Sequence, residues 1–321
     1  VENVDLFRDP GGPMAHALQD VVRFLLRGTY LHTPTTNQRF YHDGEPVTAS
    51  VMVENRGGSV QETEVRFTLT AVGSEDPLVT LTRKARVHPG TRQRVEAPLG
   101  QVGGRPDLYR VDMVLRVDRE SVDELTTGFV VHQPEIVAAG SELRFVENYF
   151  TFDGRPMLLF GSDESAHVYL APQENPLTWS EDLLAARDIG VMVYENLHYR
   201  CPGYDFTEKD WRDFRAMGQL TQRHNMVFMP GMLVTNRLAA DAATRAKQAA
   251  HCEAYAKMFS DTPGLIYYLN GDVGFGVHEY VEDMTRRWND WLKRRYETTD
   301  RIRAAWGAEN LKGELGSLPF P

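Results

Sequence analysis

Acidic, amide and imidazole side chains follow short apolar runs in the second half of this 321-residue chain. A carboxyl group can act as a general acid or base, and neighbouring polar groups can contact a substrate. Side chains of this kind after a strand are therefore candidates for a binding or catalytic site. In chain order the candidates are Asp163, Glu164, Glu195, Asn196, His198, Asn270 and Asp272.

Each candidate also has an ordinary structural interpretation. Residues 270–272 read Asn-Gly-Asp, which contains two pairs that readily form turns. Glu195 can pair with a neighbouring arginine, and His198 can be a hydrogen-bonded loop histidine. Asp163 and Glu164 can cap the segment that follows them. The residues alone leave the structural and the functional interpretations open.

The elements that must position these side chains alternate between apolar runs and amphipathic helices. Four apolar runs are predicted strands: residues 156–161, 191–195, 226–229 and 265–269. Helical periodicity predicts helices between and after them, at residues 179–188, 208–224, 239–259 and 279–296. Thr207 and Asp210 fit a capping box before the second of these helices. Such repetition requires a parallel sheet with right-handed crossovers, and parallel strands place their carboxyl ends on one edge.

The first 135 residues have a different pattern. One amphipathic helix is predicted at residues 15–26, with Leu18, Val21, Val22 and Leu25 on a face that we expect to be buried. From residue 45 to residue 131 the period becomes two, and turn-forming clusters separate the segments 47–53, 64–69 and 109–117. Short strands at this spacing predict an antiparallel, Ig-like β-sandwich. The predicted domains are an N-terminal helical segment at 1–40, the sandwich at 41–135 and the strand–helix repeat at 150–321.

Four strand–helix units can form a small open sheet or half of an eight-stranded barrel. A complete barrel needs about 250 residues, and only 166 follow Arg155. If the repeat belongs to a barrel, this chain contains its first half. The open strand edge and the apolar interior of such a half barrel would then have to be covered, either by further polypeptide of the same chain or by a second subunit.

Three short stretches resemble the clan A glycoside hydrolases. Residues 150–161 (Phe-Thr-Phe-Asp-Gly-Arg-Pro-Met-Leu-Leu-Phe-Gly) resemble the passage from sandwich to barrel in family 2, the β-galactosidase and β-glucuronidase family. Residues 198–202 (His-Tyr-Arg-Cys-Pro) are similar to a loop of the same family. Residues 288–296, with Ala-Trp-Gly at 305–307 and Leu-Pro at 318–319, are similar to a stretch of the family 42 β-galactosidases.

This resemblance implies a β-sandwich followed by the first half of a (β/α)8 barrel, and a retaining, β-galactosidase-like activity on a β-linked sugar. It implies that Asp272 is the catalytic acid and that Asn270 binds the sugar 2-hydroxyl. The clan has an Asn-Glu pair at this place, whereas here Gly271 stands between Asn270 and a shorter Asp. The clan's nucleophile, a Glu after the seventh strand, has no counterpart in this chain. The Asn-Gly-Asp departure and the absence of a second barrel half from these residues both favour an alternative: a non-catalytic carbohydrate-binding or scaffold subunit.

Composition and motifs exclude several other functions. A formal net charge of −10 disfavours nucleic acid as a partner, and no apolar run approaches the roughly 20 residues of a membrane span. No metal-binding, phosphate-cradling or dinucleotide motif is present, so we expect no cofactor. The two cysteines form no disulfide framework and no signal peptide is visible, which favours a cytoplasmic protein. The expected partners are a carbohydrate substrate and the remaining half of the barrel, from the same gene product or from a second chain in an oligomer.

Overall fold

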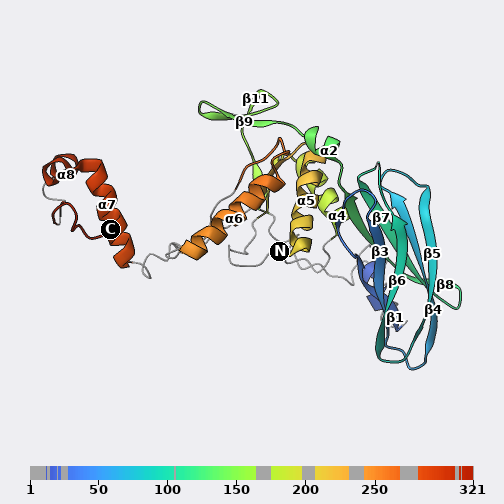
Figure 1. The fold of residues 1–321 in the computed structure, drawn as a ribbon. Helices are drawn as coiled ribbons and strands as arrows, with labels where there is room; N and C mark the ends of the chain where they lie inside the picture. Colours follow the sequence, from blue (N-terminus) through green and yellow to red (C-terminus); the bar gives the residue numbers. More distant parts are fainter. Residues whose placement is uncertain are drawn as a thin grey trace. The chain divides into compact units, whose positions relative to one another are not determined.

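The structure is a computed structural model (Figure 1). It describes residues 12, 15–19, 21–22, 28–104, 106–163, 175–196, 207–230, 242–267, 281–307, 311 and 313–320. The chain divides into two compact units. The first comprises Val1–Asn196, Phe206–Met229 and Phe259–Ile266, and the second comprises Leu197–Asp205, Pro230–Met258 and Tyr267–Pro321.

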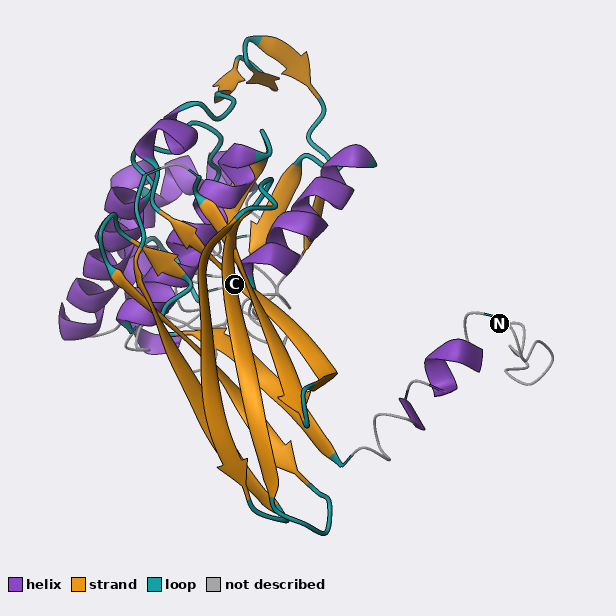
Figure 2. Ribbon diagram, turned by 90° about the vertical axis from the view of Figure 1, so that its right-hand side faces the viewer, coloured by secondary structure: helices purple, strands orange, loops and turns teal. Residues whose placement is uncertain are grey.

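Two β-sheets dominate the first unit (Figure 2). Their strands are β1 (Thr29–Thr36), β2 (Phe40–Tyr41), β3 (Pro46–Asn55), β4 (Gln61–Ala71), β5 (Pro77–Val87), β6 (Thr91–Gln101), β7 (Leu108–Val117) and β8 (Glu120–Val131). One sheet has the order β1-β3-β6, and the other has the order β2-β8-β7-β4-β5. The predicted strands at 47–53, 64–69 and 109–117 are confirmed within β3, β4 and β7.

The prediction of a purely antiparallel sandwich is wrong at one place. The short strand β2 pairs with β8 in parallel, with Phe40 opposite Val130. Strand β1 also lies in a stretch that the sequence pattern groups with the N-terminal helix, because its proline and threonines show no clear alternation. The Ig-like assignment and the domain boundaries stay predictions.

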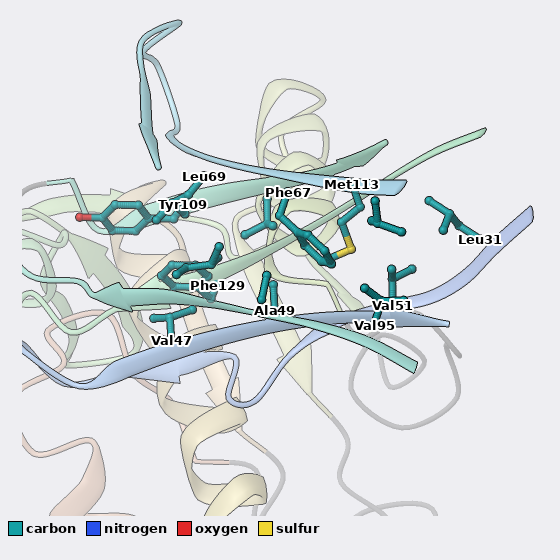
Figure 3. Packing of buried hydrophobic residues seen from close by; sticks show 14 of the residues in the cluster. Leu31, Val47, Ala49, Val51, Phe67, Leu69, Val95, Tyr109, Met113 and Phe129 are labelled. Carbon is teal, nitrogen blue, oxygen red and sulfur yellow. The ribbon is translucent and has the colours of Figure 1, made fainter. Parts of the chain in front are cut away.

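Side chains from both sheets form one apolar core (Figure 3). Along β4, Val65, Phe67 and Leu69 are buried, while the residues between them are partly exposed. This alternation follows from the two-residue period of a strand. On the neighbouring strands, Tyr109 and Phe129 stack with ring centroids 5.1 Å apart. The two sheets therefore have a continuous, close-packed interior.

A three-stranded hairpin sheet connects this core to the rest of the first unit. Helix α2 (Pro134–Ala138) leads into β9 (Leu143–Val146), β10 (Tyr149–Phe152) and β11 (Arg155–Met157), which pair in the order β11-β10-β9. Asp153 and Gly154 form the two-residue turn between β10 and β11, with φ values of 49° and 74°. Two successive positive φ values are the signature of a type I′ hairpin turn, for which Asp-Gly is a favoured pair.

The predicted first parallel strand at residues 156–161 is therefore wrong in its position. Its beginning pairs antiparallel in the hairpin, and Leu158 and Phe160 are 92% and 63% exposed. The parallel strand starts only at Gly161. An apolar run indicates that a segment can be buried, but it does not show where the chain bends.

Three parallel strands follow in chain order. They are β12 (Gly161–Asp163), β13 (Val193–Asn196) and β14 (Val227–Pro230), and their order in the sheet is β12-β13-β14. A fourth position is marked by a parallel bridge between Phe228 and Leu265. The predicted runs at 191–195, 226–229 and 265–269 are thus confirmed as parallel strand positions where the structure describes them. Val193 and Val227 pack with Phe152 of the hairpin in a second apolar cluster.

Two helices of the first unit match their predictions closely. They are α4 (Pro176–Asp188) and α5 (Glu208–Arg223). At the start of α5, the Thr207 hydroxyl accepts a hydrogen bond from the Asp210 backbone N–H, and the Asp210 carboxylate accepts one from the Thr207 N–H. The predicted capping box is confirmed. Gly218 in α5 allows Phe259 to pack closely, since an added Cβ would lie 2.9 Å from the Phe259 ring.

Helix α5 is tied to the sandwich by polar side chains. Arg212 donates two hydrogen bonds to the Glu45 carboxylate, at 2.7 and 3.0 Å. Arg39 forms an ion pair with Asp213, whose side chain is 3% exposed. Gln219 donates to the carbonyl oxygen of Val131 at 2.9 Å. Arg223 forms a further ion pair with Asp107 of the sandwich.

The second unit contains α6 (Ala242–Met258), α7 (Val281–Tyr296) and α8 (Thr299–Trp306). The first two confirm the helices predicted at 239–259 and 279–296 within the described residues. Leu292, Ile302 and Leu318 form the buried centre of the α7–α8 hairpin. No helix in the described part of the chain combines the length and apolar composition that crossing a membrane requires.

The N-terminal helix differs from its prediction. Residues 15–19 and 21–22 are helical, but Leu18, Val21 and Val22 are 44%, 53% and 48% exposed. The prediction that this face is buried is wrong for these residues. A helical period shows that one face is apolar, but it does not show that the same chain covers that face.

The Asn289 side chain in α7 forms hydrogen bonds with the C-terminal segment. Its replacement should destabilise the α7–α8 hairpin. Its side-chain amide donates to the carbonyl oxygens of Leu318 and Thr285, both at 2.8 Å, and its oxygen accepts from the Leu318 N–H at 2.9 Å. The side chain is buried, so Asn289→Ala leaves backbone groups without partners. We expect a loss of about 1–3 kcal/mol in the free energy of unfolding, measured by urea denaturation. Asp290→Ala, at the exposed neighbouring position, is the control, and an equal loss in both variants would contradict the prediction.

Candidate functional site

The carboxyl ends of the parallel strands bring three of the predicted site residues to one edge of the sheet. Asp163 ends β12 and lies in register with Glu195 of β13. Asn196 is the last residue of β13. Neighbouring strands are about 4.8 Å apart, so the backbones of Asp163 and Glu195 are direct neighbours. Glu195 and Asn196 follow Asp163 by 32 and 33 positions in the sequence, and the parallel pairing alone joins them.

An aromatic pair lies on the helix-covered face of this sheet, close to the same edge. Tyr194 precedes Glu195, and its ring stacks on Phe228 of β14 with centroids 6.4 Å apart and an interplanar angle of 14°. Both rings are buried. Glu195 itself is partly exposed. Successive side chains of a strand point to opposite faces, so Glu195 lies on the face that carries Val193 and not on the face of Tyr194. Its partly exposed carboxylate can accept hydrogen bonds from hydroxyl groups of a substrate.

The other predicted site residues lie outside the described residues. These are Glu164, His198, Asn270 and Asp272, and the side chains of Asp163 and Asn196 are also outside them. The description of the fourth strand position ends at Tyr267. Burial raises the pKa of the Tyr267 hydroxyl, which donates a hydrogen bond to the carbonyl oxygen of Tyr255. The roles assigned to Asn270 and Asp272 stay predictions.

The structure also brings together a serine and a histidine at the distance of a catalytic pair, which the sequence did not reveal. The Ser180 hydroxyl of α4 and Nε2 of His224, at the end of α5, are 2.8 Å apart. This is the distance expected between a nucleophile and its base. Both side chains are buried, however, and burial lowers the pKa of His224 to about 4. The pair is therefore a neutral hydrogen bond that joins two helices, and no local sequence signal could have linked residues 44 positions apart.

The low pKa of His224 makes the fold sensitive to acid. The unfolded chain takes up the histidine proton near pH 6.5, whereas the folded chain resists it until about pH 4. Stability present above pH 6.5 is therefore lost as the pH falls from 6.5 to 4, by about 3 kcal/mol for this group. We expect His224→Gln to flatten this part of the stability profile, measured by urea denaturation at several pH values. His88→Gln, at an exposed histidine, is the control, and an unchanged slope in His224→Gln would refute the assignment.

Comparisons with known proteins give structural likeness only. No protein-family model matches the sequence, and no curated protein matches it. Among solved structures, the chain is similar to a Bacteroides uniformis β-glucuronidase 2, with 14% identity and a TM-score of 0.37 over 84% of this chain and 34% of that one. It is also similar to an exo-chitosanase from Amycolatopsis orientalis, with 13% identity and a TM-score of 0.32 over 75% of this chain and 28% of that one.

A third similar structure is a glycosyl hydrolase family 2 member from Bacteroides cellulosilyticus, with 14% identity and a TM-score of 0.35 over 83% of this chain and 34% of that one. The chain therefore spans about a third of the length of the solved structures that it matches. These structures are glycoside hydrolases by name. At such identities and TM-scores, the likeness carries no information about substrate or catalytic residues.

Proposed function

We propose that this chain is part of a retaining glycosidase, most similar to a β-galactosidase, that acts on a β-linked sugar. The observation that carries the proposal is the register of Asp163 and Glu195 at the carboxyl ends of parallel strands β12 and β13. Strand ends of this kind hold the substrate-binding and catalytic side chains of (β/α)8 barrels. The order sandwich, hairpin and parallel strands supports the same assignment.

The proposed chemistry needs two carboxyl groups on opposite sides of a glycosidic bond. Asp272 donates a proton to the leaving oxygen, and Asn270 holds the sugar 2-hydroxyl. The nucleophilic carboxylate comes from polypeptide outside these 321 residues. Five residues at or just after the carboxyl ends of the first two parallel strands contact the substrate: Asp163, Glu164, Glu195, Asn196 and His198.

The parallel strands are proposed to be the first half of a (β/α)8 barrel. The remaining strands come from the same gene product or from a second chain, and the assembly is oligomeric in the second case. Leu158 and Phe160, two apolar side chains before β12, are exposed. We propose that the remaining half of the barrel covers them.

The experiment is an activity screen of the longest natural form of the protein. It is incubated with aryl β-glycosides of galactose, glucose, glucuronic acid and glucosamine, and the anomer first released is identified by proton NMR. Release of the aryl group with retention of the anomeric configuration supports the proposal. Release of the inverted anomer contradicts the retaining mechanism. If no aryl group is released from any of the glycosides, the proposal of a glycosidase is contradicted.

The second candidate is a non-catalytic carbohydrate-binding subunit, which a hollow between the sandwich and α4 favours. This hollow, of about 600 Å³, lies beside the turn between β4 and β5, and Arg110, Asp112 and Glu181 line it. Arg110 and Thr126 both donate to the Asp112 carboxylate at 2.7 Å, which fixes its position. Calorimetric binding of a sugar without product, abolished by Asp112→Ala, would support this candidate.

A further inference from the structure

Three indole rings form a stack in the second compact unit. Trp288 lies between Trp291, at a centroid distance of 5.4 Å and an angle of 13°, and Trp306, at 5.9 Å and 24°. Phe320 meets Trp288 edge-on, and Tyr296 meets both outer rings edge-on. Trp291 is therefore the outermost ring of a braced stack, and it is 43% exposed. Its conformation is held without a ligand, so binding there costs little side-chain entropy.

Most of the charged helix positions around Trp291 are basic, and one exposed acid, Asp290, precedes it. In α7 the positions three and four residues to either side are Arg287, Trp288, Arg294 and Arg295. Residues at this spacing are neighbours on a helix surface. All three arginines are exposed, and none of the four positions is acidic. A local patch of three guanidinium groups stands out in a chain whose net charge is −10.

The patch is poorly suited to becoming the interior of a larger protein. Burying three arginines against an apolar face would remove their hydration without providing anions. An anionic ligand with a flat apolar face meets both requirements, because the indole offers a stacking surface and guanidinium groups pair with carboxylates through two parallel hydrogen bonds. Sugar rings that carry carboxylate groups have this combination of features.

We propose that Trp291, Arg287, Arg294 and Arg295 form a surface site for an oligosaccharide that bears carboxylate groups. The indole of Trp291 packs against one sugar ring, and the arginines bind carboxylates of that ring and of its neighbours. This site shares no residue with the candidate strand-end set, and it requires neither Asp272 nor catalytic activity.

The test is titration calorimetry of the longest natural form of the protein with octagalacturonate at low and moderate salt. We expect binding that weakens as salt rises, because the paired charges become screened. Trp291→Ala should weaken binding at least tenfold, and Trp291→Tyr should restore part of it because an aromatic face remains. Arg294→Gln combined with Arg295→Gln should weaken binding and reduce its salt dependence. The matched control is Arg301→Gln, an exposed arginine of α8 that is paired with Glu297.

Circular dichroism of each variant shows whether the helices remain. Folded Trp291→Ala that binds octagalacturonate as tightly as the parent chain would overturn the proposal. So would equal binding of neutral maltohexaose, or binding of sulfated maltohexaose without binding of octagalacturonate. Tighter binding of an oligothymidylate through the same residues would overturn the carbohydrate assignment in favour of a single-stranded nucleic acid.

Discussion

Replacement of Asp272 by asparagine is expected to lower turnover of aryl β-glycosides about 10²–10⁴-fold, the usual contribution of a general acid. Asparagine keeps the size of the side chain but has no acidic proton for the leaving oxygen. The loss should be largest for glycosides with poor leaving groups, because a phenolate of low basicity needs less protonation. The measurement is kcat for a series of substituted aryl glycosides in the longest natural form of the protein.

Two features of this experiment separate catalysis from folding. An activated substrate such as a dinitrophenyl glycoside should be cleaved by Asp272→Asn at nearly the parent rate in the step that forms the glycosyl intermediate. Asp290→Asn, an exposed carboxylate in α7, is the matched control and should retain full turnover with every substrate. Equal turnover of all substrates by Asp272→Asn and the parent protein would remove Asp272 from the mechanism.

The second large effect concerns the buried ion pair between Arg39 and Asp213. Their side chains are 10% and 3% exposed, and the closest N···O distance is 2.5 Å. Burial lowers the pKa of Arg39 and raises the pKa of Asp213, so each charge depends on the other. Lys209 also contacts Asp213, at 3.0 Å, but is itself half exposed. Arg39→Leu is expected to lower the free energy of unfolding by about 3–5 kcal/mol, because it leaves a buried carboxylate without its main partner.

The pH dependence and a double variant test the cause of this loss. Without Arg39, Asp213 is stabilised by protonation, so the deficit should shrink as the pH falls from about 7 to about 5. Arg39→Leu combined with Asp213→Leu should be more stable than Arg39→Leu alone, since no charge remains buried. Arg86→Leu, which breaks an exposed pair with Glu62, should cost less than about 1 kcal/mol. A deficit in Arg39→Leu that is small and independent of pH would contradict the argument.

The features that could be predicted from the sequence depend on local patterns. The capping box of Thr207 and Asp210 joins residues three positions apart, and the alternation along β4 is visible within eleven residues. The parallel strand positions could be predicted because apolar runs alternate with helices. The site could be predicted only as far as strand order brings Asp163 and Glu195 together.

The features that could not be predicted join distant residues or depend on a bend. Arg39 and Asp213 are separated by 174 positions, and each alone has the pattern of a surface charge. The parallel pairing of β2 with β8 involves two residues without a pattern of their own. The predicted start of β12 is too early because one apolar run is divided between two sheets: Pro156 and Met157 pair antiparallel in the hairpin, and β12 begins only at Gly161.

The polar face of α5 has a consequence for how the first unit unfolds. One side of this helix carries the groups that bind Glu45, Asp107 and Val131 of the sandwich. Elsewhere on the helix, Gly218 lies close to the ring of Phe228 in the parallel sheet. Unfolding of α5 would expose buried polar groups of the sandwich and, at the same time, apolar groups of the parallel sheet. Sandwich and parallel sheet should therefore lose their hydrogen-exchange protection in a single cooperative transition rather than one after the other.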